Sequence, residues 1–160
     1  MDTEQVFLSY AKRDFDFANR LYRELTRRGV KLWFDHASLR PGENWQVSIK
    51  KAIRESRFFL ALLSNNSVNH IGYVQKELKL GIGTLDLFPE TDIYIIPIRL
   101  DICEPTHDRL KDLHWLDLFP ENSYVNGIQR ILNVVSPTRK AFRSTFQELS
   151  MEEVISITKR

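Results

Sequence analysis

The sequence has few of the residues that build disulfide frameworks and metal sites. Cys103 is the only cysteine among 160 residues, so no internal disulfide can form, which suits a reducing compartment and leads us to expect a cytoplasmic protein. The histidines are His36, His70, His107 and His114. None of them pairs with another histidine or with the cysteine at a zinc-like spacing, so we expect no metal site.

The sequence also lacks a long apolar run and a large excess of either charge. The longest apolar run, FFLALL at 58–63, is far too short to cross a bilayer, and MDTEQ at the N-terminus has none of the features of an export signal. Its 23 basic and 21 acidic residues give a net charge of +2. We therefore expect neither a membrane partner nor a direct nucleic-acid partner.

Four short apolar runs, rich in β-branched and aromatic residues, predict strands that are buried on both faces. They are VFLSY at 6–10, VKLWF at 30–34, FFLALL at 58–63 and IYIIPI at 93–98. Pro97 lies inside the fourth run and has no N–H to donate to a sheet ladder, so we expect a bulge or an edge position there.

Helical patterns separate these runs. Apolar residues recur at helical spacing over 15–25, with Asp14 as the expected N-cap and Gly29 as the expected C′ residue. Three more helices are predicted over 45–53, 71–82 and 124–135. Strands that alternate with helices of this length predict an α/β fold, an open parallel sheet with helices on both faces.

The character of the chain changes at Ser136-Pro137. We expect one domain over 1–135 and an extension over 136–160, in which Ser150 and Glu153 have the spacing of a capping box. Two interpretations of the extension stay open. It is either a C-terminal helix packed on the domain or a linker toward a further module.

Glu77 is the residue that most invites a functional explanation. No lysine or arginine lies three or four positions from it, so it has no ion-pair partner on its own helix. Tyr73 lies one turn before it, and the helix follows the third predicted strand, where open parallel sheets bind ligands. Ring and carboxylate together form a usable ligand platform, while the alternative is an ordinary solvated glutamate.

Three other patterns carry weaker signals. Cys103 and His107 are close enough in sequence to form a nucleophile pair, but a small buried cysteine is the simpler interpretation. The GIG at 81–83 follows a helical pattern instead of linking a strand to a helix, so it fails the context of a phosphate loop. In SLRPGENW at 38–45, Pro-Gly marks a surface turn, and Trp45 is expected to anchor the next helix in the core.

Several motifs together resemble the sequence boxes of a Toll/interleukin receptor (TIR) domain. In order they are VFLSYA, KLWFD with SLRPGENW, ALLSNNSV with GYVQKEL, and IYIIPIRLD. Four separated motifs across about residues 4–135 make the resemblance specific. The subgroup that it resembles is the bacterial type with GYVQKE on the third helix. This resemblance implies a flavodoxin-like sheet of about five parallel strands.

The resemblance also implies an activity. Many family members of this type hydrolyse NAD+ at the bond between nicotinamide and ribose, giving ADP-ribose, and some instead form a cyclic isomer. NAD+ is the substrate, and no further cofactor is implied. Glu77 matches the catalytic carboxylate. Tyr73 matches the ring that stacks on the substrate, at a position where the family often has tryptophan. One carboxylate can suffice because nicotinamide starts as a cation and leaves neutral, without an acid.

The resemblance gives binding roles to other residues. Tyr10 and Lys12 match an aromatic and a basic residue near the nucleotide, and Arg13 is an alternative to Lys12. Trp45 lies near the position of a site aromatic. Ser67, at the start of the helix after the third strand, is expected to face the same opening.

The loop over 36–44, which carries Arg40, matches a mobile loop that in the family contacts a neighbouring protomer and helps complete the site. We therefore expect self-association, with activity switched on by assembly in bacterial defence or signalling and with a possible fused or associated sensor module. One alternative is a non-catalytic module that only docks onto other TIR domains. A CheY-like or flavodoxin-like regulator would need an acidic cluster or a phosphate loop after the first strand, where this chain has Ala11-Lys12-Arg13.

Overall fold

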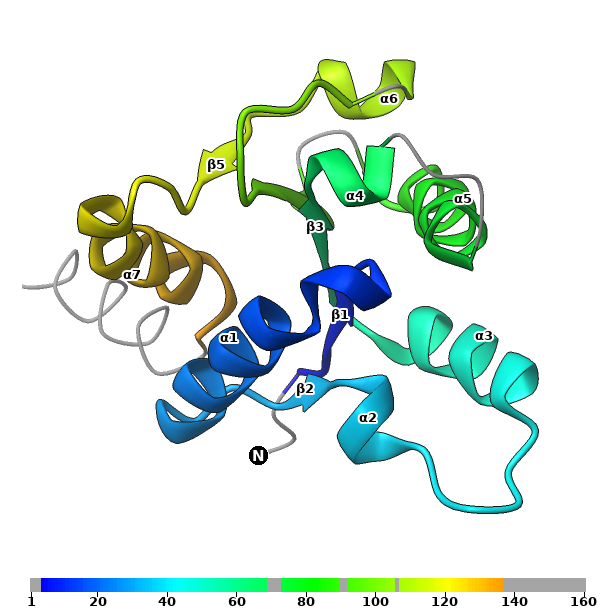
Figure 1. Cartoon of the computed structure of the whole chain (residues 1–160). Coiled ribbons are helices and arrows are strands. Elements are labelled where there is room, and N and C mark those ends of the chain that lie inside the picture. The colour runs from blue at the N-terminus through cyan, green and yellow to red at the C-terminus, as the bar shows by residue number, and fades with distance from the viewer. Residues whose placement is uncertain (1–3, 69–72, 90–91, 106, 137–160) are drawn as a thin grey trace, which may run out of the picture.

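A five-stranded sheet forms the centre of the computed structural model, which describes residues 4–68, 73–89, 92–105 and 107–136 (Figure 1). All neighbouring strands are parallel, in the order β2-β1-β3-β4-β5. The strands are β1 (Val6–Ser9), β2 (Leu32–Trp33), β3 (Phe58–Leu63), β4 (Ile95–Arg99) and β5 (Leu116–Asp117). This order is the flavodoxin-like one, so the predicted fold class is confirmed.

The helices include all four that the apolar spacing predicts. They are η1 (Lys12–Asp14), α1 (Phe15–Arg27), α2 (Asp35–Ser38), α3 (Trp45–Glu55), α4 (Asn65–Val68), α5 (Tyr73–Leu85), α6 (Asp108–Lys111), η2 (Glu121–Ser123) and α7 (Tyr124–Val135). Gly29 follows α1 with φ +89°, as expected of a C′ residue. None of the helices in the described part of the chain has both the length and the apolar character needed to span a bilayer. The predicted extension lies outside the described residues, apart from Ser136.

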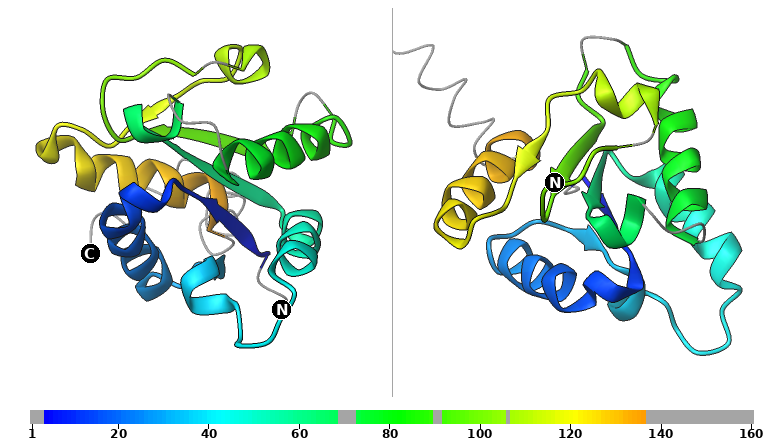
Figure 2. Two further views of the ribbon diagram at one scale, coloured as in Figure 1. Left: turned by 45° about the vertical axis from the view of Figure 1, so that its right-hand side comes forward. Right: turned by 45° about the horizontal axis from the view of Figure 1, so that its top comes forward.

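The two faces of the sheet carry two separate cores. Helices α1 and α7 cover one face and α3 and α5 cover the other (Figures 1 and 2). Side chains alternate between the faces along a strand, so Val6 and Leu8 pack toward α1 while Phe7 packs toward α3 and α5. Ser9 lies two residues after Phe7 and therefore shares the face of α5.

Pro97 corrects one expectation. It lies in register opposite Ala61, with neither a bulge nor an edge position, because β4 is between β3 and β5. On the side of β3, the Leu100 N–H donates to the Leu63 carbonyl, whereas on the side of β5 the Arg99 carbonyl accepts from the Leu118 N–H. Alternate residues face opposite neighbours, so the missing N–H of Pro97 points to the side of β5. That strand pairs with β4 only from Ile98 onward, and no ladder bond is lost.

Gly81 allows α5 to lie close to the sheet. A Cβ added at this position would come within 2.8 Å of the Phe59 ring, which is fully buried, whereas a Cβ at Gly83 would meet nothing within 4 Å. We expect Gly81→Ala to lower the free energy of unfolding by about 1–3 kcal/mol through overpacking. Gly83→Ala, the matched control, should raise it by about 0.5–1 kcal/mol through helix propensity. Urea denaturation measures both, and equal effects would contradict the close approach.

Candidate functional site

The Glu77 side chain is buried above the carboxyl end of β1. It is only 4% exposed, and Ser9 Oγ donates a hydrogen bond to Glu77 Oε2 at 3.0 Å. The interpretation of Glu77 as a solvated helix residue is therefore wrong. Because burial of a carboxylate is costly, hydrogen-bond donors at such a position matter for its ionised form.

This position is also the switch point of the sheet. The connection after β1 runs through α1 to β2, and the connection after β3 runs through α4 and α5 to β4. The two connections therefore leave the boundary between β1 and β3 in opposite directions. In open α/β sheets, ligands bind in the crevice outside the carboxyl ends of the strands at such a point. Glu77 on α5 and Ser9 in β1 thus meet where this topology favours a ligand site.

Tyr10 lies on the opposite face from Ser9, at the end of the same strand. Its hydroxyl donates to Asp35 Oδ1 at 2.6 Å, and its ring packs on Phe34 with centroids 5.3 Å apart. Burial, then the hydrogen bond and charge of Asp35, and then the charge of Glu77 raise the pKa of Tyr10 far above its usual range. Tyr10 therefore stays a neutral hydrogen-bond donor.

Lys12 and Arg13 supply positive charge beside this position. Both lie in η1, which follows β1 after Ala11, and both are exposed. Within the described residues, neither forms an ion pair. Two exposed cations thus follow the strand that carries Ser9, and they are available to an anionic ligand.

Asp14 ties two of the loops together. It takes the predicted N-cap position of α1, but its side chain does not cap the helix. Instead, its carboxylate accepts from Ser64 Oγ and, at 2.9 Å, from Asn66 Nδ2. Asp101 in turn accepts from the backbone N–H of Asn65. The loops after β1, β3 and β4 are therefore linked at the carboxyl edge of the sheet.

Ser67 and Tyr73 belong to the segment between β3 and α5. Ser67 is buried, and its hydroxyl accepts from the Ser64 N–H at 2.8 Å and donates to the Ser64 carbonyl at 3.0 Å. These bonds hold the turn that begins α4. Tyr73 begins α5, but its side chain lies outside the described residues. The substrate contacts expected of both residues stay predictions.

The loop between α2 and α3 has a defined turn. Pro41 and Gly42 are its central residues, with φ +89° at Gly42, and the Glu43 N–H donates to the Arg40 carbonyl at 3.1 Å. Arg40 Nε also pairs with Glu43 Oε1 at 2.6 Å. The loop extends beyond α3, away from α5 (Figures 1 and 2). Within one copy of the chain, Arg40 thus pairs with Glu43 on the same loop.

Trp45 is not the core anchor that the sequence suggested. It begins α3, directly after the N-cap residue Asn44, and is 46% exposed. The buried side of α3 is formed by Ile49, Ala52 and Ile53. Because α3 packs against α5, Trp45 stays a candidate for the site.

Cys103 does not have the surroundings of a nucleophile. It is 4% exposed, and burial, helped by the Asp101 carboxylate, raises the pKa of its thiol to about 11. His107 Nδ1 accepts the backbone N–H of Arg109 at 3.2 Å. The simpler interpretation of a small buried cysteine is therefore the better one.

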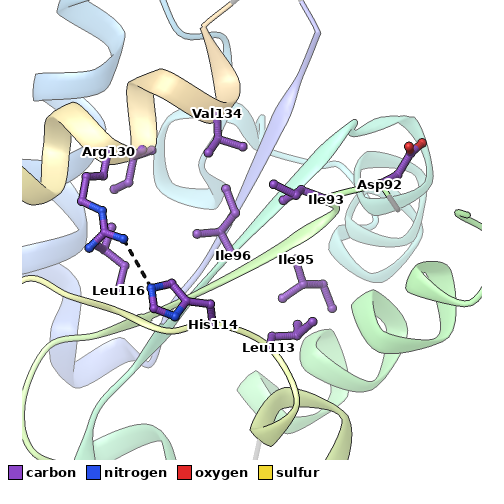
Figure 3. A pocket seen from close by; sticks show the side chains of 10 residues that line it. Asp92, Ile93, Ile95, Ile96, Leu113, His114, Leu116, Arg130 and Val134 are labelled. Carbon is purple, nitrogen blue, oxygen red and sulfur yellow. Dashed lines mark hydrogen bonds between the residues drawn. The ribbon is translucent and has the colours of Figure 1, made fainter. Parts of the chain in front are cut away.

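A cavity of about 310 Å³ lies away from Glu77, between β4, β5 and α7. Figure 3 shows its walls, formed by apolar side chains such as Ile95, Ile96 and Val134, with His114 and Arg130 together on one side. His114 Nε2 and Arg130 Nη2 are 3.3 Å apart. Within the described residues, no three His, Cys, Asp or Glu side chains cluster in a way that could hold a metal ion.

The sequence did not indicate the roles of two residues of this site. Ser9 supplies a hydrogen bond to Glu77, and Asp35 holds the hydroxyl of Tyr10. Both contacts join residues far apart in the chain, so no local spacing reveals them. The one available signal for Ser9 is a polar residue at the end of an apolar strand.

Comparison with known proteins agrees with this arrangement. The TIR domain family model matches residues 6–132. The NAD(+) hydrolase PdTIR of Paracoccus denitrificans is 38% identical over 74 residues, which cover 46% of this chain and 24% of that protein. The NAD(+) hydrolase TcpC of Escherichia coli is 36% identical over 64 residues, covering 39% and 21%. The chain thus spans about a quarter or less of these relatives' lengths.

Solved structures agree on the fold. The TIR domain of the Toll-related receptor TRR-2 from Hydra magnipapillata superimposes with a TM-score of 0.66 at 22% identity, covering 81% of this chain and 96% of that one. At this identity the likeness concerns the arrangement of strands and helices alone.

The burial of Cys103 predicts low reactivity. At pH 8, alkylation of Cys103 by iodoacetamide should be about a hundredfold slower in the folded protein than in the urea-unfolded chain, because little thiolate is present. N-acetylcysteine under the same conditions corrects for the effect of urea on the reagent. Equal rates in the folded and unfolded protein would instead indicate an accessible, activated thiol.

Proposed function

This chain belongs to the TIR domain family, and we propose that it is an NAD+ hydrolase that cleaves the bond between nicotinamide and ribose. The observation that carries the proposal is the burial of Glu77 beside the carboxyl end of β1, with Ser9 donating to its carboxylate. Two bacterial relatives are named NAD(+) hydrolases, which supports the same activity.

The proposed reaction needs stabilisation of positive charge more than proton transfer. As the bond between C1′ of the ribose and the pyridinium nitrogen breaks, its electron pair goes to the nitrogen, and nicotinamide leaves as a neutral molecule. The ribose becomes an oxocarbenium-like cation. An ionised Glu77 carboxylate, held in a site with little water, would stabilise this cation electrostatically and orient the ribose hydroxyls.

The product depends on what then attacks C1′. Attack by water, with loss of its proton, gives ADP-ribose, whereas attack by a nucleophile of the same molecule gives a cyclic isomer. NAD+ is the substrate in both cases, and no further cofactor takes part. The proposal includes both outcomes.

The residues around Glu77 suit the rest of the substrate. The exposed cations of Lys12 and Arg13 would attract the diphosphate of NAD+. Tyr10 would contribute the edge of its aromatic ring, and its hydroxyl already donates a hydrogen bond to Asp35. Tyr73, one turn before Glu77, and Trp45, at the start of α3, are the proposed stacking rings.

Self-association through the loop over 36–44 is the proposed means of activation. Arg40 is 84% exposed on this loop, which extends away from α5 in a single copy of the chain. A contribution of Arg40 to the site would therefore come from a neighbouring copy. We propose that an upstream signal in bacterial defence, received by a fused or associated sensor module, assembles this domain in the cytoplasm.

Glu77→Gln tests the catalytic role directly. The amide keeps the size of the side chain but removes its charge, so we expect NAD+ consumption to fall by about two to four powers of ten. The measurement is chromatography of nicotinamide and ADP-ribose products over time. Glu55→Gln, an exposed substitution on α3, is the control and should leave the rate unchanged.

Both variants must first show the circular dichroism and melting behaviour of a folded domain. A fully active Glu77→Gln protein would overturn the proposal. An unmodified protein that consumes no NAD+ at any concentration, even when crowded on a surface, would instead favour a non-catalytic TIR-TIR docking module.

The loop makes a separate prediction about concentration. Arg40→Glu replaces the ion pair between the exposed Arg40 and the half-buried Glu43 with a repulsion, so it should leave the fold intact and weaken assembly. We expect activity at high protein concentration to fall roughly tenfold, toward the value of the dilute protein. Rate against concentration, together with analytical ultracentrifugation, measures this. Arg23→Glu, on the exposed side of α1, is the control. An unchanged concentration dependence in Arg40→Glu would count against the loop.

A further inference from the structure

Ser9 is a polar residue in a strand that is otherwise apolar. It is 1% exposed and lies in register opposite Ala61 of β3, on a strand with neighbours on both sides. A buried hydroxyl needs a hydrogen-bond partner, because it costs free energy without one. Ser9 finds its partner in Glu77 Oε2, contributed by a helix that lies 68 residues further along the chain.

The two ends of this hydrogen bond differ in rigidity. Ser9 is fixed by the sheet, and its side chain has a single rotatable bond to the hydroxyl. Glu77 has three rotatable bonds between the backbone and its carboxylate, and each loses freedom when the carboxylate is held. Because the strand holds Ser9 in place, the hydrogen bond restricts the position of the Glu77 carboxylate.

We propose that Ser9 is a positioning residue for the Glu77 carboxylate, a role that rests on the proposed NAD+ hydrolysis. Its hydroxyl fixes one carboxylate oxygen against β1 and favours the charged form of the carboxylate by donating to it. Ser9 itself neither transfers a proton nor attacks the substrate. It acts through Glu77, which it holds ready for the cation that develops on the ribose.

The effect of Ser9 on Glu77 can be tested by its pH dependence, and the other charged groups around α5 allow this. Tyr10, at the end of β1, stays protonated through the neutral range, and Asp35 lies behind it. Arg99 on β4 is paired with Asp117 at 2.6 Å. Helix α3 contributes only exposed charges, at Lys50, Lys51, Arg54 and Glu55. Ser9 carries no charge, so Ser9→Ala removes its hydrogen bond to Glu77 Oε2 and leaves every charge in place.

The test compares two serines that are equally buried. Ser56 is 3% exposed, and its hydroxyl donates to the Ala52 carbonyl at 2.6 Å and accepts from Gln5 Nε2 at 2.9 Å. It lies just before the amino end of β3, at the opposite edge of the sheet from the carboxyl end of β1. Ser9→Ala should lower kcat for NAD+ about ten- to hundredfold, leave KM within about twofold, and move the acid limb of the pH profile upward. Ser56→Ala should lose a similar amount of stability with an unchanged kcat and pH profile. Ser9→Thr, which keeps a hydroxyl on a strand-forming residue, should recover most of the activity.

A second measurement does not need turnover. The carboxyl carbon of Glu77, labelled with ¹³C and assigned by its absence in Glu77→Gln, can be titrated by NMR. In Ser9→Ala its titration midpoint should move to higher pH, and in Ser56→Ala it should stay in place. An unmodified protein without NAD+ turnover at any concentration would refute the proposed function, whereas this titration would still test the contact. An unmoved midpoint in Ser9→Ala, or an equal fall of kcat in both alanine variants, would overturn the positioning role.

Discussion

The burial of one carboxylate at the carboxyl end of β1 is the constraint on which the site depends. A glutamate that is 4% exposed loses most of its hydration, and hydrogen-bond donors of the protein must replace part of it. Ser9 does so from the centre of the sheet, at 3.0 Å. The same burial that makes the carboxylate costly also strengthens its electric field, because little water screens it. A group that stabilises a developing cation needs this combination of charge and dryness.

The sheet topology explains why this carboxylate and its surroundings meet. With β1 between β2 and β3, the residues that follow β1 and β3 lie side by side at the switch point of the sheet. Asp14 then bonds to Ser64 and Asn66 across that boundary, so the loops that frame the position are linked to each other. Gly81 lets α5 approach Phe59 closely, which brings the helix down on the same face of the sheet. Core packing and site geometry are thus parts of one arrangement.

The sequence was enough for the long elements and for singling out Glu77 as a candidate, but not for the contacts between distant residues. The run 58–63 predicted β3 to the residue, because a strand buried on both faces is apolar throughout. Strand β5 has two residues and gives no periodic signal. The expectation for Pro97 was wrong because a strand tolerates a proline where the neighbouring strand has not yet begun to pair. The expectation that Trp45 is buried was wrong, although a tryptophan at helical spacing usually is. Residue order cannot reveal that Ser9 reaches Glu77, since the chain must first fold to bring them together.

The most direct test is a crystal structure of the folded Glu77→Gln variant with NAD+ bound and uncleaved. We expect density for the nicotinamide ribose beside residue 77 at the carboxyl end of β1, with the diphosphate toward Lys12 and Arg13. NAD+ bound anywhere else on the domain, or no binding at millimolar concentration in the assembled state, would contradict the claim that the buried carboxylate marks the active site.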